Sequence, residues 1–174
     1  MSLNVTIVPI GNPDPNVLRT LANDLAAIGF DVEATRGEAV PDVAYSAPRR
    51  QYKADALLTP LGRYGGDRVL GVTDVDLYVD GLNFALGLAS ERGRIALISL
   101  ACLSLGAGSG QLRTRALKEA VHELGHSFGL GHCSDSNCVM HFSNSLADTD
   151  RKMSRFCATC QDRLGHAGWP TAES

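Results

Sequence analysis

The residues with the clearest chemistry lie in the stretch HELGHSFGLGH, which runs from His122 to His132. His122 and His126 are four residues apart, so on a helix their imidazoles lie on one face, one turn apart. Gly129 permits a sharp bend after that helix, and the bend would bring His132 back to the other two imidazoles. Three nitrogen ligands suit a zinc ion that keeps a fourth position for water, which is the arrangement of a catalytic site.

Glu123 follows the first of these histidines and is not needed as a ligand. Its carboxylate is placed to take a proton from a zinc-bound water, because the metal lowers the pKa of that water. The set therefore predicts a hydroxide-like nucleophile that attacks a zinc-polarised carbonyl. The alternative is a non-catalytic zinc module that binds peptide ends or a partner; Glu123 argues against it, since a pure binding site has no use for that carboxylate.

Four cysteines form a second pattern, C-x4-C followed by C-x2-C, made of Cys133, Cys138, Cys157 and Cys160. Two close pairs of thiolates are the usual ligands of a closed, structural zinc site. Such an ion would stabilise residues 129–174, which have little apolar periodicity. The competing interpretation is a disulfide or a redox dithiol, but redox pairs of this spacing open a helix in a thioredoxin-like βαβ unit, which the pattern lacks.

Met140 follows the third histidine of the motif by eight residues. Although methionine usually fills a hydrophobic core, this position predicts a tight turn whose thioether packs beneath the histidines. His141 and His166 fit no ligand spacing, so we expect neither to bind metal. Cys102 is expected to be a core thiol on a strand.

Length and composition indicate one domain with a hydrophobic core, since 174 residues are 44% hydrophobic and 20% charged. With 16 basic and 19 acidic residues, the net charge of -3 argues against a nucleic-acid partner. No apolar run reaches the roughly 18 residues of a membrane span, and the first residues lack the cationic start of a secretory signal. We therefore expect a cytoplasmic monomer with reduced thiols and no membrane partner.

The elements that must position these residues can be read from hydrophobic periodicity. Residues 3–10 predict a buried strand, and an apolar stripe before Gly29 predicts a helix. A helix from 112 to 128 carries the histidines and turns Leu117, Val121, Leu124 and Phe128 toward the core. The remaining expectations are strands over 30–34, 69–79 (half-exposed) and 94–105, a loop over 36–50 and a helix over 51–61.

Together these motifs resemble the archaemetzincins, a branch of the metzincin zinc peptidases. The resemblance rests on the histidine motif, Met140, the four downstream cysteines, GVTDVDLY at residues 71–78 and FSNSL at residues 142–146. It therefore spans most of the chain. In one respect the chain departs from the wider metzincins: several of those have a zinc-reaching tyrosine at the position of Phe142, and here no tyrosine follows Tyr78.

The resemblance implies an α+β, zincin-like fold with a twisted mixed sheet and packed helices, including the active-site helix, in residues 1–131. A small irregular C-terminal subdomain, residues 132–174, would hold the Met-turn and the cysteine zinc. The implied function is a zinc metallopeptidase that cleaves peptides or unfolded protein, with Glu123 as general base and acid. Two zinc ions per chain are implied, one catalytic and one structural, and the edge strand that lines the cleft is expected within 94–105.

Overall fold

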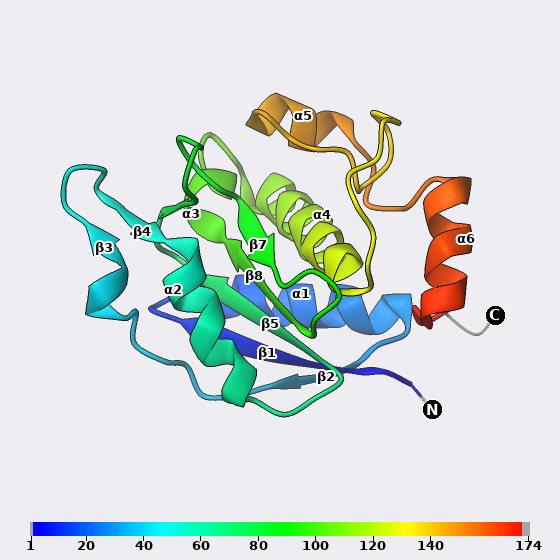
Figure 1. Cartoon of the computed structure of the whole chain (residues 1–174), viewed down its shortest axis with the longest axis horizontal. Helices are drawn as coiled ribbons and strands as arrows, with labels where there is room; N and C mark the ends of the chain where they lie inside the picture. The colour runs from blue at the N-terminus through cyan, green and yellow to red at the C-terminus, as the bar shows by residue number, and fades with distance from the viewer. Residues whose placement is uncertain (1, 172–174) are drawn as a thin grey trace.

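A five-stranded sheet forms the centre of the computed structural model, which describes residues 2–171 (Figure 1). Its strand order is β2-β1-β5-β8-β7. The first four of these strands are parallel and β7 is antiparallel to β8, so β7 forms one free edge of the sheet. The strands are β1 (Asn4–Ile10), β2 (Asp31–Ala34), β5 (Arg68–Thr73), β7 (Gly87–Ala89) and β8 (Ile95–Ser99).

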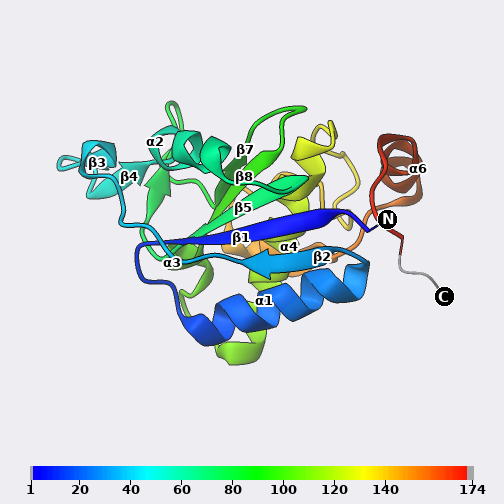
Figure 2. The ribbon, with the colours of Figure 1, turned by 90° about the horizontal axis from the view of Figure 1, so that it is seen from below.

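Helices cover both faces of this sheet (Figure 2). On one face lie α1 (Pro15–Ile28) and α4 (Ser109–Ser127), and on the other lies α2 (Ala54–Leu58), followed by a 3-10 turn. The predicted first strand and both long helices are confirmed. Gly29 ends α1 with a φ of 119°, a conformation that glycine adopts at little cost.

Strand β5 lies in the middle of the sheet, so the expected half-exposed strand over 69–79 is wrong. Its residues alternate between the two cores: Val69 packs with α2, whereas Leu70 and Val72 pack with α1 and α4. A parallel strand that is buried on both faces reads as a nearly continuous apolar run. The apparent alternation came from acidic residues at 74 and 76, which lie beyond the end of the strand.

A small second sheet consists of β3 (Tyr45–Ser46), β4 (Gln51–Lys53) and β6 (Leu77–Tyr78). It corrects two expectations, because β3 lies within the predicted loop and β4 occupies the start of the predicted 51–61 helix. The Gln51 side chain donates to the Asp76 carboxylate and to the Asn83 carbonyl, at 3.1 and 2.9 Å. These contacts hold residues 51–53 in an extended conformation, so the helix begins only at residue 54.

Strand β8 ends at Ser99, and the short helix α3 (Leu100–Leu103) follows it. The Ser99 hydroxyl caps α3 by accepting a hydrogen bond from the backbone N–H of Ala101 at 3.2 Å. Cys102 therefore lies on a helix and not on a strand, with its sulfur 3.3 Å from an Asp76 carboxylate oxygen. The 94–105 segment also does not supply the sheet edge at the cleft, because β8 lies between β5 and β7.

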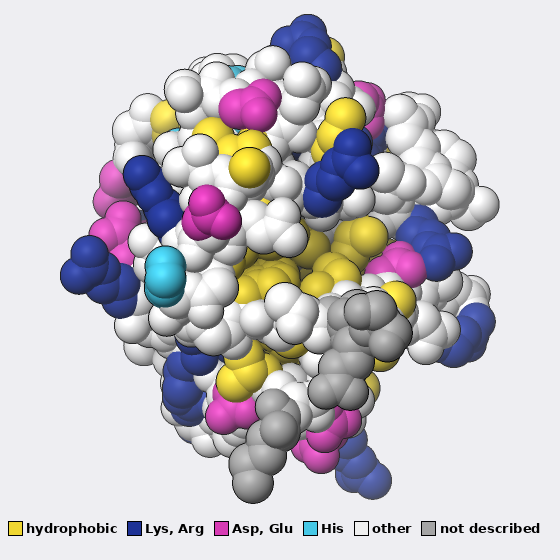
Figure 3. Space-filling model, turned by 90° about the vertical axis from the view of Figure 1, so that its right-hand side faces the viewer, with side chains coloured by type: hydrophobic (Ala, Val, Ile, Leu, Met, Phe, Trp, Pro, Cys, Tyr) yellow, Lys and Arg dark blue, Asp and Glu magenta, His cyan; other side chains and the backbone are white. Residues whose placement is uncertain are grey.

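Residues 132–171 contain two short helices, α5 (Leu146–Arg151) and α6 (Ala158–Ala167), and no strand. An aromatic cluster joins this segment to the sheet domain, because the Trp169 ring lies 5.1 Å from Phe30 and Phe128 and 5.0 Å from Phe156 between centroids. Figure 3 shows the face that carries α6, with hydrophobic side chains gathered in its central hollow. Within residues 2–171, no helix combines the length and apolarity needed to cross a bilayer.

Candidate functional site

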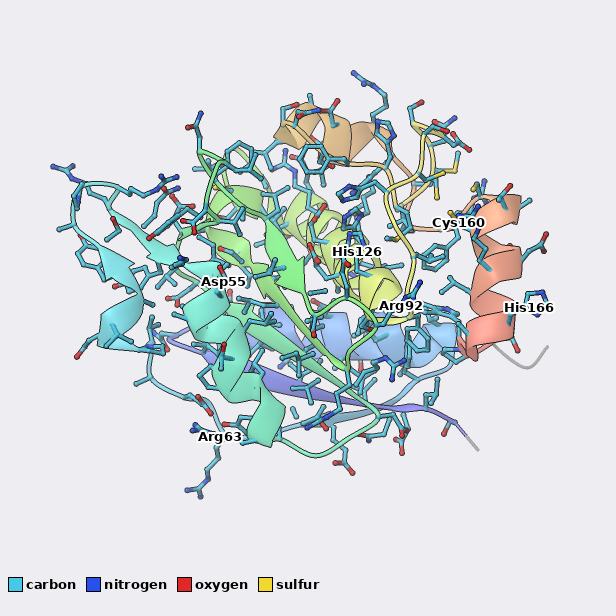
Figure 4. All side chains as sticks on the ribbon, viewed as in Figure 1. Asp55, Arg63, Arg92, His126, Cys160 and His166 are labelled. Atoms are coloured by element: carbon cyan, nitrogen blue, oxygen red, sulfur yellow. The ribbon has the colours of Figure 1, made fainter. Side chains whose placement is uncertain are left out.

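Helix α4 carries the first two histidines, and His126 lies on the side that faces the C-terminal segment (Figure 4). Its apolar side chains, among them Val121 and Leu124, pack into the core, which orients the helix. His122 is buried and His126 is half-buried, and both line a cleft of about 420 Å³. The i,i+4 spacing therefore places both imidazoles in one cavity, as expected.

The bend after α4 returns the third histidine to this cavity. Gly129 has a φ of 94°, and its N–H donates to the His126 carbonyl at 2.9 Å. The Leu130 N–H donates to the Gly125 carbonyl at 3.1 Å, which closes the end of the helix. As a result, the ring centroid of His132 lies 5.4 Å from that of His122 and 4.9 Å from that of His126.

Backbone carbonyls set the orientation of the two helical imidazoles. Nδ1 of His122 lies 2.8 Å from the Val139 carbonyl oxygen, and Nδ1 of His126 lies 2.7 Å from that of Leu130. A carbonyl only accepts, so both Nδ1 atoms donate and both Nε2 atoms keep a free lone pair. These Nε2 atoms face each other at 3.1 Å.

This donor set fits a zinc ion. Two lone pairs at 3.1 Å repel each other unless a cation lies between them. Tetrahedral zinc with bonds of about 2.0–2.1 Å would hold two nitrogens roughly 3.3 Å apart. One ring nitrogen from each of the three histidines lies within 4.8 Å of the others, and no further His, Cys, Asp or Glu of residues 2–171 belongs to this group.

The electrostatics of the site favour neutral imidazoles, the form that binds metal. Burial lowers the pKa of His122 well below its usual value, and nearby Lys152 and His126 lower it further. Burial also lowers the pKa of His132, again with help from His126 and Lys152. The cleft is therefore prepared to receive a cation without first losing protons from these rings.

Glu123 points its carboxylate into the same cleft, beside the edge strand. A Cβ built on Gly87 would lie 2.7 Å from Glu123 Oε1, so the glycine leaves the space that the carboxylate occupies. Burial is the main reason why the pKa of Glu123 is raised well above its usual value; Glu119 adds to the shift and Lys152 opposes it. This carboxylate therefore has high proton affinity, as a group that accepts a proton requires.

Two segments form the walls of the cleft above α4. Strand β7 and the residues before it, from Leu82, form one wall, and Phe142, Ser143 and Asn144 belong to the other. The Phe142 ring lies 5.0 Å from the His132 ring between centroids. The position after the Met-turn thus places a phenyl ring, without a hydroxyl, against the third histidine.

Met140 is fully buried and packs against Gly125, next to His126 on α4. The Met140 carbonyl accepts a hydrogen bond from the Cys133 N–H at 3.0 Å, which ties the turn to the residue after His132. The expected turn at Met140 therefore lies against the histidine helix. It also connects the two groups of possible metal ligands.

The four C-terminal cysteines form a second group, in which the four sulfurs lie within 4.8 Å of one another. The sulfurs of Cys133 and Cys157 are 3.7 Å apart, much farther than the roughly 2.05 Å of a disulfide, and all four residues are free thiols. Tetrahedral zinc with bonds of about 2.3 Å would space two sulfurs roughly 3.8 Å apart. The sulfur geometry fits zinc better than the competing disulfide.

The protonation of these thiols is uneven without a metal. A hydrogen bond from the Cys160 backbone lowers the pKa of Cys157, whereas burial raises the pKa of both Cys138 and Cys160. Buried thiolates need a countercharge, which a dication supplies. The donor chemistry of this cluster therefore also fits zinc.

Within residues 2–171, the other two histidines belong to neither group of possible metal ligands. His141 is close to the cysteine group, but its Nδ1 lies 2.8 Å from the Cys133 carbonyl oxygen. His166 lies on the outer side of α6 and points away from the cleft (Figure 4).

Two further residues, Glu119 and Lys152, line the cleft and were not predicted from the sequence. Their charged groups lie 3.2 Å apart, and both side chains are buried. One signal could have indicated Glu119: it precedes His122 and Glu123 by three and four residues, so it shares their helix face. Nothing in the sequence pattern points to Lys152, because only the path of the chain after the Met-turn brings it to α4.

Comparisons with known proteins agree with this geometry. Residues 30–166 match the model of a family described as peptidase family M54. An archaemetzincin of Methanopyrus kandleri is 51% identical over 127 residues, which cover 72% of this chain and 72% of that protein.

Solved structures are also similar over nearly the whole chain. The crystal structure of archaemetzincin from Methanopyrus kandleri superposes with a TM-score of 0.87 at 39% identity, and the match covers 95% of each chain. A zinc-dependent peptidase from Methanocorpusculum labreanum superposes with a TM-score of 0.82 at 26% identity and covers 92% of this chain and 99% of that one.

Proposed function

The chain belongs to peptidase family M54 and is a metallopeptidase, and we propose that it cleaves peptide bonds as a zinc enzyme in which Glu123 moves the protons. The family and the mixed α+β fold expected from the sequence are thereby confirmed. The observation that carries the proposed mechanism is the convergence of three imidazole nitrogens within 4.8 Å in the cleft that the Glu123 carboxylate enters. The proposed ligands of this zinc are His122, His126 and His132.

Each group in the cleft has a distinct part in the proposed reaction. When bound, zinc supplies Lewis acidity, which lowers the pKa of water and polarises a carbonyl. The carboxylate of Glu123 accepts the proton of the attacking water and later gives it to the leaving amine. The carbonyls of Val139 and Leu130 hold the two helical imidazoles in the tautomer that leaves Nε2 free.

Strand β7 is the proposed partner of an extended substrate. Ser99 N–H donates to the Leu86 carbonyl and Ser90 N–H to the Ile95 carbonyl, so alternate residues from Leu86 bond to β8. In an antiparallel pair the residues between them, Gly87 and Ala89, turn their backbone groups to the open side. A peptide or an unfolded segment can add there as a further strand, beside Glu123.

We assign the four cysteines to a second, structural zinc. This ion would stabilise residues 132–174, which we regard as a C-terminal subdomain on the zincin-like unit formed by residues 1–131. The total would be two zinc ions per chain. Monomeric state and cytoplasmic location stay predictions of the sequence.

The test of the mechanism is Glu123→Gln, which keeps the shape of the side chain and removes its basicity. We expect zinc content to stay unchanged while the release of new amino termini from a mixed peptide library falls by at least about a hundredfold. Glu33→Gln, an exposed carboxylate on β2, is the matched control and should retain full activity.

Two outcomes would contradict the proposal. Hydrolysis that persists in Glu123→Gln would remove Glu123 from the mechanism. A zinc-loaded wild-type chain that binds the peptides but cleaves none of them would favour the alternative, a non-catalytic peptide- or partner-binding module.

A further inference from the structure

One face of α4 carries charged side chains that neither zinc binding nor proton transfer uses. Arg115, Lys118 and Glu119 are all buried and precede His122 by three to seven residues. They face the segment after the Met-turn: Lys118 Nζ, for example, donates to the Thr149 carbonyl at 2.9 Å. The chain therefore connects α4 to the C-terminal segment through a row of buried polar contacts.

Lys152 makes the contacts of this row that lie nearest the candidate zinc site. Its Nζ is 3.2 Å from Glu119 Oε1 and donates to the His141 carbonyl at 3.2 Å. Glu119 lies one helical turn before His122, and His141 follows Met140 directly. A single ammonium group thus touches the helix that carries two histidines and the turn that packs against it.

Both members of this pair line the cleft, yet they expose almost no surface to it. The side chain of Lys152 is 0% exposed and that of Glu119 is 4% exposed. Within residues 2–171, Glu119 Oε1 has no partner in hydrogen-bond geometry, so its close contact is the Lys152 ion pair. The main contacts of the pair are therefore the helix and the turn on either side of it.

We propose that Glu119 and Lys152 are positioning residues, which hold the Met-turn against α4. The three imidazoles thereby keep the relative positions in which they can bind one zinc ion. The turn supplies the Val139 carbonyl that orients His122, so a shift of the turn moves a ligand directly. This inference rests on the proposed function only in that the histidines bind zinc. Groups that orient metal ligands typically account for 10–100-fold in metal affinity or activity.

A second ion pair offers a matched comparison. Arg115 and Asp150 also join α4 to α5, with two contacts of 2.7 and 2.8 Å; the Arg115 side chain is buried, whereas that of Asp150 is 36% exposed. This pair lies about two helical turns before His122 and does not line the cleft. Its loss should weaken the fold without moving the Met-turn.

The experiment compares Lys152→Met with Asp150→Asn in the full chain. Zinc retention is measured against increasing chelator, and His126→Ala provides the background of the cysteine site alone. We expect Lys152→Met to lower zinc affinity at the histidine site at least tenfold. Its kcat should fall by a larger factor than the factor by which KM changes. Asp150→Asn should lower Tm yet keep zinc affinity within about twofold.

Two further variants separate positioning from general stability. Lys152→Arg keeps the charge and should recover a large part of the zinc affinity. The double variant Glu119→Met/Lys152→Met replaces the buried pair by apolar groups. Such a replacement commonly restores stability. We therefore expect its Tm to recover while its zinc affinity stays low. If Lys152→Met does not fold, this double variant still gives the decisive zinc measurement.

The inference is overturned if the double variant binds zinc as tightly as the wild type, or if Lys152→Met and Asp150→Asn lose affinity in proportion to Tm. A different result would overturn the proposed function itself. If the wild-type chain loses no more zinc to the chelator than His126→Ala does, the three histidines do not bind zinc.

Discussion

Gly125 and Met140 are in such close contact that a Cβ built on the glycine would lie 2.5 Å from the methionine sulfur. A glycine inside a helix costs about 0.5–1 kcal/mol relative to alanine. Here it lets the Met-turn approach the backbone of α4 directly beside His126. The glycine of the HELGH motif is thus explained by packing on the side of the helix where the turn lies.

We predict that Gly125→Ala lowers the free energy of unfolding, because overpacking against the fully buried Met140 costs about 1–3 kcal/mol and outweighs the roughly 0.5–1 kcal/mol that alanine gains in a helix. Urea denaturation measures the change. Gly110→Ala, in the first turn of the same helix, is the control: nothing lies within 4 Å of a Cβ there, so stability should be equal or slightly higher. Equal stability of Gly125→Ala and the wild type would contradict the prediction.

Gly87 has a comparable relation to Glu123 on the other side of the cleft. Its Cβ would lie 2.7 Å from both Cγ and Oε1 of Glu123 and 2.6 Å from the Leu97 carbonyl oxygen. We predict that Gly87→Ala displaces the carboxylate and lowers kcat at least tenfold, since a shift of about 1 Å can cost a hundredfold in rate. Steady-state kinetics on a cleaved peptide measures this, and zinc content should not change.

Gly65→Ala is the control for that variant, because nothing lies within 4 Å of a Cβ at position 65. It should keep the kcat of the wild type. A normal kcat in Gly87→Ala would show that strand β7 moves to accommodate the methyl group while the Glu123 carboxylate stays in place. Gly87 would then not position that carboxylate.

Removal of one thiolate should loosen the C-terminal segment selectively. We predict that Cys157→Ser binds one zinc fewer per chain and loses hydrogen-exchange protection in α6, while β1 and β5 stay protected. Elemental analysis and exchange mass spectrometry measure the two effects. Cys102→Ser should keep both ions; if Cys157→Ser also keeps both, the four cysteines do not form a zinc site.

Cys102 should react unusually slowly with alkylating reagents. Burial, together with the Asp76 carboxylate, raises its pKa to about 11. Since only the thiolate reacts, its rate at pH 8 should be roughly a hundredfold or more below that of an ordinary thiol, and it should rise about tenfold per pH unit without a plateau up to pH 9.5.

The Cys102 rate is obtained by comparing the wild type with Cys102→Ser, which lacks this thiol. Asp76→Asn should raise the rate at every pH, because it removes a negative charge next to the thiolate. A rate that levels off as the pH approaches 9.5 would mean that the thiol ionises normally.

The helix and the histidine site could be predicted because their geometry is local. Spacings of four residues on a helix and a glycine bend bring His122, His126 and His132 together, although distant contacts such as the Val139 carbonyl set the final ring orientation. The same holds for α1, whose stripe and terminal glycine are both visible in the sequence. These features depend on periodicity and on single backbone conformations.

Errors arose where distant contacts decide the structure. Gln51 reads as part of a helix, but its side chain contacts Asp76, so the segment is extended. The edge of the sheet could not be identified either, because three residues of β7 leave almost no periodic signal. No sequence pattern singles out Lys152, because only the fold brings it to Glu119 in the interior.

The aromatic cluster around residue 169 gives the molecule a built-in optical reporter. Trp169 is the one tryptophan of the chain, and its indole contacts rings from the residue before β2, the residue after α4 and the segment before α6. Its emission therefore reports on the place where the cysteine-rich segment meets the sheet domain. A change of solvent or chelator that separates the two should shift this single signal before the helical far-UV spectrum responds.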